Sequence, residues 1–331
     1  MNNKVKLNME IYEENFKIAK KAFLLNSNLE ASACAAAFIG ASEPTTEEDL
    51  KSAKKYLYKN TSALSTLGRG HARQVVAGTL AMSGDPEDAL SKIKTIHKAL
   101  DKKFFNSDYL VLAATIIYKS CKTSEYDRVI KRTREIYKLL KKDHPFLTGR
   151  EDIANCAMMA ISDIDTEKLS LYCESDFKAI KKEFFGKNKI QYLACVSSVF
   201  EGESEDKAKK IRKTYEMLKS EGVRFDSDAF SIISAIAMIV DDADKKAVIK
   251  KIKDTSDDLK NIRGMGPLGT GKRIRNLIAS AIVIDAYAKG SNSAAASTAV
   301  NAIITAVITA ELVAIAAASA AAASAAASSA N

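Results

Sequence analysis

The chain alternates between two kinds of segment, and this alternation restricts its fold more than any other feature. One kind is apolar and rich in alanine, as in "SDYLVLAATIIYKS" and "KIQYLACVSSVFEG", whereas the other is longer and rich in Lys and Glu, as in "SEYDRVIKRTREIYKLLKKDH". The apolar segments recur roughly every 40 residues, which is the spacing of helical-hairpin repeats. Because one hairpin cannot bury its own apolar helix, the pattern predicts that neighbouring hairpins stack on one another.

The spacing of apolar residues inside the charged segments is helical. In "DPEDALSKIKTIHKALDKKFF" apolar side chains recur at Leu90, Ile93 and Ile96, which marks one buried helix face. Asp85 followed by Pro86 is a typical helix start. No segment alternates apolar and polar residues one by one over the length of a strand, so we predict an all-α fold.

The regular spacing also predicts how the helices are arranged. We expect a right-handed superhelix or toroid of helical-hairpin repeats with about 40 residues per repeat, the apolar helices inside and the lysine-rich ones outside. No linker interrupts the rhythm, so residues 1–289 are predicted to form one α-helical repeat (solenoid) domain. The pattern does not decide whether this solenoid is open or closed.

The composition changes after Lys289. Residues 290–331 are rich in Ala and Ser and contain a single charge, Glu311, and alanine favours a long C-terminal helix with a tail. We expect this helix to cap the last apolar helix of the solenoid. Self-association into a homo-oligomer and a membrane span are the alternatives. A span is the least favoured, because Asn301 and Glu311 interrupt the apolar run.

Charge and cysteine content limit the class of protein. The 331-residue chain carries a formal net charge of +9, which permits anionic partners without requiring them. Its five cysteines are widely spaced and form no C-x-x-C pair, so we interpret them as small core residues in a reducing compartment. The charged N-terminus lacks the apolar stretch of a secretory signal. These features predict a cytoplasmic protein.

A glycine-rich stretch, "GMGPLGTGKRIR", resembles the phosphate-binding loop of nucleotide hydrolases. It lacks the Ser or Thr that should follow Lys272, and it follows a charged helical pattern instead of a strand. We therefore interpret it as a connector that stops one helix at Gly264 and starts the next near Gly271. A weak anion-binding site remains the alternative, carried by Lys272, Arg273 and Arg275 near a helix N-terminus.

The segment "HPFLTGREDIA" also contains chemically active side chains. We interpret His144 as a residue at a helix C-terminus, and Thr148 with Glu151 as a capping box that starts the next helix. The three histidines of the chain fall in different repeats, and no zinc-binding or nucleophile motif occurs. No catalytic residue, metal ligand or cofactor is predicted.

Lysines and arginines on two of the outer helices predict a second candidate site. If these helices stack side by side, their basic residues form a positive band that could follow a phosphate backbone. A solvated outer face is the alternative, because acidic residues are interleaved with the basic ones. The band comprises Arg128, Lys131, Arg132, Arg134, Lys138, Lys209, Lys210, Arg212 and Lys213.

A resemblance to a known family rests on three adjoining stretches. "DHPFLTGREDIANCAMMA" is preceded by "FFNSDYLVLAATIIY" and followed by "FFGKNKIQYLACVSSVF", and together they resemble a bacterial family known as domain of unknown function 4003 (DUF4003). The similarity extends over nearly the whole chain, including the alanine-rich C-terminus. It implies a fold but no site, because the family has no assigned chemistry, and the glycine-rich loop departs from it.

The sequence therefore predicts a scaffold or protein-interaction module, with an unknown protein as its partner. The first alternative is a nonspecific nucleic-acid or anion binder that uses the lysine-rich outer helices. The second is an enzyme with a site in the concavity of the superhelix, for which no motif exists. A membrane partner is not expected.

Overall fold

The computed structural model describes residues 1–23, 28–62, 65–102, 104, 106–226 and 229–288. Over these residues the secondary structure is helical and contains no strand, which confirms the predicted all-α class. The predicted C-terminal helix and tail at 290–331 lie outside the described residues. None of the helices within the described ranges combines the length and apolar character that crossing a membrane requires.

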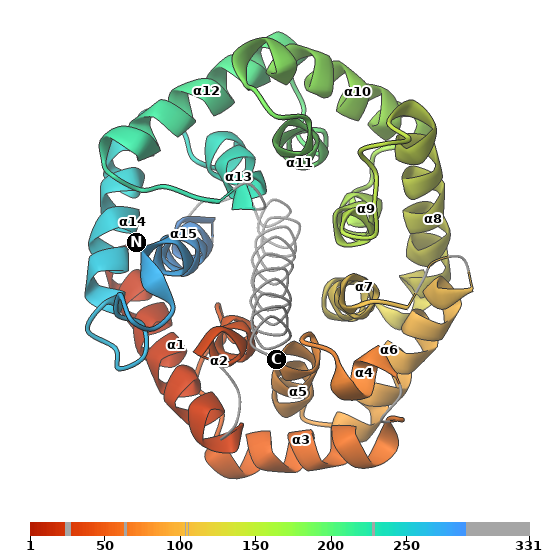
Figure 1. Ribbon diagram of the computed structural model, residues 1–331, viewed down its shortest axis with the longest axis vertical. Coiled ribbons are helices and arrows are strands. Elements are labelled where there is room, and N and C mark those ends of the chain that lie inside the picture. The colour runs from red at the N-terminus through yellow and green to blue at the C-terminus, as the bar shows by residue number, and fades with distance from the viewer. Residues whose placement is uncertain (24–27, 63–64, 103, 105, 227–228, 289–331) are drawn as a thin grey trace, which may run out of the picture.

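The helices form two concentric layers around a closed ring (Figure 1). The outer layer consists of α1 (Asn2–Ala22), α3 (Glu47–Asn60), α6 (Pro86–Asp101), α8 (Tyr126–Asp143), α10 (Thr166–Glu183), α12 (Ser204–Ser220) and α14 (Lys245–Leu259). The inner layer consists of α2 (Asn28–Ala36), α5 (Arg73–Met82), α7 (Asp108–Ser120), α9 (Asp152–Ile161), α11 (Lys187–Ser197), α13 (Ser231–Ile239) and α15 (Gly271–Ala288). A short helix, α4 (Thr66–Arg69), and a 3-10 turn, η1 (Thr123–Glu125), lie in connections.

The two layers differ because their helices differ in sequence. An outer helix such as α6 buries one face, which includes Leu90, Ile93 and Ile96, and exposes its charged residues. An inner helix such as α13 buries every side chain from Ser231 to Ala237. Amphipathic helices can face water on one side, whereas helices that are apolar all round must be enclosed.

Hydrogen bonds between the first and last helices close the ring. The Nδ2 atom of Asn8 in α1 donates to Oδ2 of Asp285 in α15 at 2.9 Å and to the carbonyl oxygen of Ile282 at 3.3 Å. Asn8 and Asp285 are almost completely buried. Buried polar groups are costly unless they are hydrogen-bonded, so this contact specifies that α1 lies against α15.

Basic side chains join successive outer helices. Lys54 in α3 donates to the carbonyl oxygen of Ala22 at the end of α1, at 2.7 Å, and Lys94 in α6 donates to that of Asn60 at the end of α3, at 3.1 Å. Arg134 in α8 donates in the same way to Ala99 near the end of α6. The last carbonyls of a helix have no partner within the helix, so a cation from the next helix both satisfies and stabilises them.

Candidate docking surface

The glycine-rich loop is a connector between α14 and α15. Gly264 and Gly271 have φ angles of 103° and 80°, which favour glycine, and α15 begins at Gly271. The amide of Thr270 donates to the carbonyl oxygen of Gly264 at 3.1 Å, and the amides of Gly269 and Gly271 donate to that of Gly266 at 2.9 and 3.3 Å. A phosphate-binding loop needs such amides to point at the ligand, but here they are used inside the loop.

The three basic residues after this loop point to different partners. Arg275 is buried and donates from Nε to the carbonyl oxygen of Ser256 at 3.2 Å and from Nη1 to that of Met265 at 2.5 Å. Arg273 forms an ion pair with Asp226. Arg275 therefore holds the connector against α14. Of the three basic residues, Lys272 forms no hydrogen bond or ion pair among the described residues.

The basic band is divided between neighbouring helices and solvent. Arg132 donates to the carbonyl oxygens of Ser162 and Ile164 beyond the end of α9, and Arg212 donates to that of Glu183 at 3.1 Å. Arg134, as described above, binds the end of α6. These three guanidinium groups fasten one helical unit to the next. Lys131 and Lys209 form surface ion pairs within their own helices, and Arg128 pairs with Glu125 in the turn that precedes α8. The remaining members are Lys138, Lys210 and Lys213.

The "HPFLT" segment forms a turn that several hydrogen bonds fix. Lys141 donates to the carbonyl oxygens of Pro145 and Thr148 at 2.7 and 2.6 Å. Thr148 Oγ1 donates back to the carbonyl oxygen of Leu140 at 3.1 Å. The predicted capping box of Thr148 and Glu151 is therefore wrong. The Thr148 hydroxyl binds the preceding helix, and Glu151 stands at the N-cap of α9 but its side chain forms no capping hydrogen bond. The interpretation of His144 is confirmed, since it ends α8.

Acidic and basic side chains separate along the outer helices. The first turns of α3, α6, α8, α10 and α12 carry acidic residues, whereas α14 begins with Lys245 and Lys246. The acidic residues are Glu47, Glu48, Asp49, Glu87, Asp88, Asp127, Glu167, Glu205 and Asp206. Each outer helix except α14, which has Asp257 and Asp258 near its end, carries basic residues in its last turn. These are Lys20, Lys21, Lys59, Lys98, Lys141, Lys142, Lys181, Lys182 and Lys219. The helix dipole favours each sign at its terminus.

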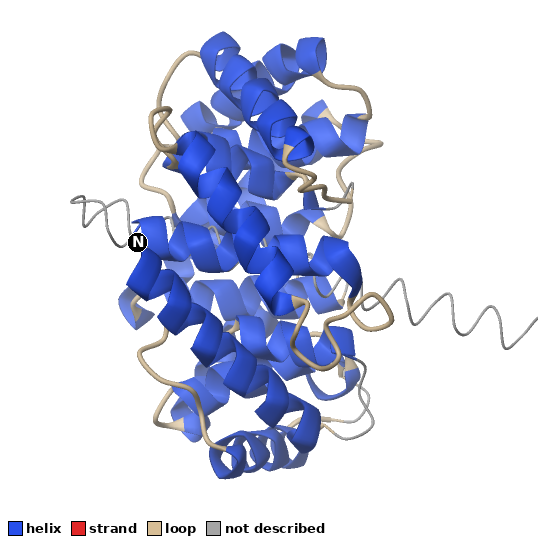
Figure 2. Cartoon of the chain, turned by 90° about the vertical axis from the view of Figure 1, so that its left-hand side faces the viewer, coloured by secondary structure: helices blue, strands red, loops and turns tan. Residues whose placement is uncertain are grey.

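This separation gives the ring two unlike ends. Each outer helix leads into an inner helix that runs back, so the outer helices share one direction and their connections emerge at opposite ends (Figure 2). We call the end with the last turns of the outer helices the basic end, and the other the acidic end. The two signs meet where neighbouring outer helices adjoin, because Lys21 and Lys182 form ion pairs with Glu47 and Glu205 in the first turn of the next outer helix, at 3.5 and 2.6 Å.

Three large apolar side chains project from the connections of the basic end. Phe146 lies between α8 and α9, Phe185 between α10 and α11, and Leu268 between α14 and α15. The two phenylalanines are 99% and 97% exposed and Leu268 is fully exposed, whereas the next most exposed large apolar side chain among the described residues, Leu171, is 68% exposed. We call these three side chains the apolar tips. Single exposed apolar side chains are common on protein surfaces, so the distinguishing feature of these three is that they all lie on connections at the same end of the ring.

A pocket of about 290 Å³ lies in the region that carries Phe146 and Phe185. It is lined by His144, Leu147, Glu174, Phe177, Lys178, Lys181 and Lys187. His144 Nε2 lies 2.8 Å from Glu174 Oε2, and its ring stacks on that of Phe177 with 4.3 Å between centroids. Glu174 also pairs with Lys178 at 3.1 Å. Lys181 and Lys187 have no ion-pair partner in the described part of the chain, which leaves the pocket positively charged.

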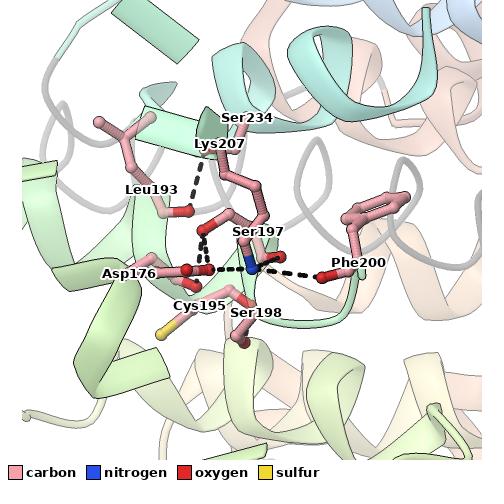
Figure 3. A network of polar contacts seen from close by, with 9 residues as sticks. Asp176, Leu193, Cys195, Ser197, Ser198, Phe200, Lys207 and Ser234 are labelled. Carbon is pink, nitrogen blue, oxygen red and sulfur yellow. Dashed lines mark hydrogen bonds and ion pairs between the residues drawn. The ribbon is translucent and has the colours of Figure 1, made fainter. Parts of the chain in front are cut away.

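A second cluster of charged residues is buried between the layers (Figure 3). Lys207 Nζ in α12 lies 2.7 Å from Asp176 Oδ2 in α10, and the same carboxylate accepts a hydrogen bond from Ser197 Oγ in α11 at 2.7 Å. Lys207 also donates to the carbonyl oxygens of Ser197 and Phe200 at 3.3 and 3.2 Å. The side chains of Lys207 and Asp176 are 5% and 0% exposed. Their contacts tie three helices together, so we assign them a structural role.

Thiols and one carboxyl group in the interior have strongly altered acidity. Burial raises the pKa of Cys34 to about 12 and that of Asp152 to about 7, the latter partly offset by the amide of Gly149, which donates to its Oδ2 at 2.8 Å. Four of the five cysteines are buried, which agrees with their interpretation as core residues. No group of His, Cys, Asp and Glu side chains within the described residues has the arrangement of a metal site.

The fold and the basic end define a ring of helical hairpins that presents charge and apolar tips on one side. The chain belongs to the family described as "Protein of unknown function (DUF4003)", whose model matches residues 15–312. The resemblance carried by the "DHPFLTGREDIANCAMMA" region is thereby confirmed. No curated protein and no solved structure matches the chain significantly.

Sequence analysis missed the apolar tips. Phe146 and Phe185 are apolar letters next to helical segments, and such residues are ordinarily expected in the core. The available signal was their position: both follow a pair of lysines that ends an outer helix, in "KKDHPF" and "KKEFF". This signal is incomplete, because Phe184 follows the same lysine pair more closely than Phe185 and is buried.

Proposed function

We propose that this protein is a docking scaffold that binds a negatively charged partner surface with its basic end. The observation that carries the proposal is the coincidence of Phe146 and Phe185 with the basic last turns of α8 and α10, at the end of the ring where Leu268 is also exposed. Positive charge attracts and orients an anionic partner at long range, and exposed apolar side chains add short-range binding energy. Neither the acidic end nor the outer faces combine these two features in the described residues.

The ring supports this role by its rigidity. Its outer helices begin at residues 2, 47, 86, 126, 166, 204 and 245, intervals close to the roughly 40 residues of a helical-hairpin repeat. We therefore describe the chain up to residue 289 as one toroid of such repeats, with the right-handed sense that is usual for them. A closed ring held by buried contacts such as Asn8–Asp285 keeps its surface loops in a fixed relation, which lowers the entropic cost of binding.

The proposal places the protein in the cytoplasm and without catalytic activity. A cytoplasmic location agrees with free, buried thiols. The alternative of an anion binder that uses the outer basic band receives less support, because Arg132, Arg134 and Arg212 already bind carbonyl oxygens of neighbouring units. The basic end keeps lysines that are not used in this way, including Lys142 and Lys181.

Retention on a heparin column over a salt gradient tests the proposal. The double variant Lys142→Glu/Lys181→Glu changes the basic end. Its matched control, Lys209→Glu/Lys246→Glu, alters the net charge by the same amount near the starts of α12 and α14. We expect the basic-end variant to elute at clearly lower salt than the control, because local charge, and not net charge, binds the polyanion. Equal shifts for the two variants would contradict the assignment of the surface.

A further inference from the structure

We propose that the partner of the basic end is a lipid bilayer containing anionic phospholipids. In this arrangement Phe146 and Phe185 insert among the lipids, and the pocket between their loops holds a lipid phosphate. The inference rests on the proposed function, because it names the partner of the same surface. It concerns peripheral binding by the ring and does not involve the C-terminal segment, for which a membrane span was considered from the sequence.

The distribution of the apolar tips favours a bilayer over a folded protein. A protein interface needs a contiguous, well-packed apolar centre with anchors in shaped pockets. Here the tips stand singly on three separate connections, and charged or glycine-rich segments surround each of them. Separate tips that emerge at one end of a ring can enter a fluid apolar layer together, because lipids adapt to each of them independently. Interfacial binding by aromatic side chains beside lysines is typical of this mode.

Phe146 is held outward before any partner binds. The turn that carries it is fixed by the bonds of Lys141 to Pro145 and Thr148, and by the amides of Leu147 and Thr148, which donate to the carbonyl oxygen of His144 at 3.1 and 3.0 Å. An apolar side chain on a rigid turn loses little conformational entropy when it inserts. The turn therefore presents Phe146 to a partner outside the ring and does not let it fold back.

Phe185 is exposed because the preceding residue, Phe184, is buried. Phe184 is buried and its ring makes edge contacts with Tyr215 and Phe230, with centroids 5.5 and 6.4 Å apart. The backbone at Phe184 is extended, with φ −133° and ψ 155°, and successive side chains of an extended chain point to opposite sides. Anchoring Phe184 in the core thus fixes Phe185 in solvent.

The pocket offers the positive charge that a phosphate needs. Lys181 and Lys187 approach it from α10 and α11, the two helices that flank Phe185. Among the described residues the lining contains one carboxylate, Glu174, which is already engaged by His144 and Lys178. Two ammonium groups that form no ion pair within the described residues, near two exposed phenylalanines, match an anionic phospholipid. Its phosphate would bind the lysines, and its acyl chains would surround the phenylalanine rings.

The first experiment measures binding of the full chain to vesicles by flotation. Vesicles of phosphatidylcholine alone are compared with vesicles that also contain about 30 mol % phosphatidylglycerol, at low and physiological salt. We expect flotation only with phosphatidylglycerol. The variant Phe146→Ala/Phe185→Ala should reduce the partition coefficient about tenfold or more, since each ring contributes apolar transfer energy. Its control, Leu171→Ala, removes an exposed apolar side chain from the outer face of α10 and should bind normally.

The second experiment uses the absence of tryptophan from the chain. Phe146→Trp introduces a single indole at the tip, and we expect its emission to shift to shorter wavelength when phosphatidylglycerol vesicles are added. Leu171→Trp should show no shift. Adding excess inorganic phosphate tests whether a free ion replaces the lipid. If vesicle binding is lost in phosphate but kept in sodium chloride of the same ionic strength, the pocket binds the free anion. That result would overturn the bilayer as the partner.

The outcomes separate this inference from the proposed function. Salt-dependent retention on heparin without flotation would overturn the bilayer as partner and leave a docking scaffold for another polyanion. Flotation that the Phe146→Ala/Phe185→Ala variant does not reduce would also overturn it, because binding would then arise elsewhere in the chain. Equal binding to neutral and anionic vesicles would remove the role of the lysines. Selective flotation with a shift at Phe146→Trp alone supports the inference.

Discussion

Lys207 and Asp176 form an ion pair of 2.7 Å in which both side chains are shielded from solvent. The pair connects α12 to α10, and the hydroxyl of Ser197 in α11 completes it. Removing a charge from a buried pair leaves the partner uncompensated, which is far more costly than the pair's own net contribution. The network therefore restricts the chain to the arrangement in which these three helices meet.

The first prediction concerns this pair. Lys207→Met and Asp176→Asn should each lower the free energy of unfolding by about 3–5 kcal/mol, measured by urea denaturation. The control Lys209→Met, two positions away with its side chain 71% exposed, should cost less than about 0.5 kcal/mol. The double variant Lys207→Met/Asp176→Asn should be less destabilised than the sum of the two single changes. Additive losses would show that the two residues act independently.

The second prediction concerns the guanidinium groups that join the units. Arg212 donates to the carbonyl oxygen of Glu183 and stacks on the rings of Phe184 and Tyr215, with 5.4 and 5.5 Å to their centroids. Arg212→Ala should therefore cost about 1–3 kcal/mol of stability. Lys213→Ala, at the next and exposed position, should be within about 0.5 kcal/mol of wild type. Equal stability of the two variants in thermal denaturation would show that the contact contributes nothing.

The fold class could be predicted because it is a local property. Helical spacing and alternating composition state which segments are amphipathic and which are apolar all round. Ring closure could not be predicted, because it depends on the rotation accumulated between successive hairpins. No short sequence pattern indicates that Asn8 contacts Asp285. Arg212 illustrates the same limit. The sequence shows it only as one of several charges on a basic helix, and its contact with the carbonyl oxygen of Glu183 depends on the tertiary structure.

The apolar tips and the basic end show a different limit. The sign of the charge at each helix end can be read from the sequence. The combined charge at one end of the ring cannot, because it depends on the outer helices running in the same direction. Exposure of Phe146 depends on a turn fixed by Lys141 and Thr148, and exposure of Phe185 depends on the burial of Phe184. Composition alone places such rings in the core.

The third prediction distinguishes Lys272 from Arg275, two basic residues that follow the glycine-rich loop. Arg275→Met should lower the free energy of unfolding by about 2–4 kcal/mol, because its guanidinium satisfies the buried carbonyl oxygens of Ser256 and Met265. Lys272→Ala should leave the fold unchanged. Neither variant should alter nucleotide hydrolysis, because we expect none in the wild type. A loss of hydrolysis on changing Lys272 would restore the nucleotide-binding interpretation.

The fourth prediction concerns the thiols. Burial raises the pKa of Cys34 to about 12 and that of Cys121 to about 11, and it also raises the pKa of Cys156. The thiolate is the reactive form, so these residues should react with a disulfide reagent at pH 8 at least about a hundredfold more slowly than free cysteine. All five thiols should become reactive when the protein is unfolded. Rapid native reaction of Cys34 would reveal an opening of the core.

The fifth prediction is a pH dependence of stability set by Asp152. Its pKa rises from the ordinary 3.8 to about 7, chiefly through burial. Between about pH 4 and pH 7 the folded state holds a proton that the unfolded state releases, so the contribution of this group to stability is complete at low pH. It falls as the pH rises through this window and is lost above pH 7, a change on the order of 2–4 kcal/mol.

Asp152→Asn removes this titration and keeps a side-chain oxygen that can accept the hydrogen bond of the Gly149 amide. Relative to wild type, the variant should therefore become more stable as the pH rises from 5 to 8, when urea denaturation is measured across the range. Asp143→Asn, at an exposed position at the end of α8, serves as the control and should follow the wild-type profile. If Asp152→Asn also follows that profile, the carboxyl group is ionised in the folded protein throughout, and water must reach it.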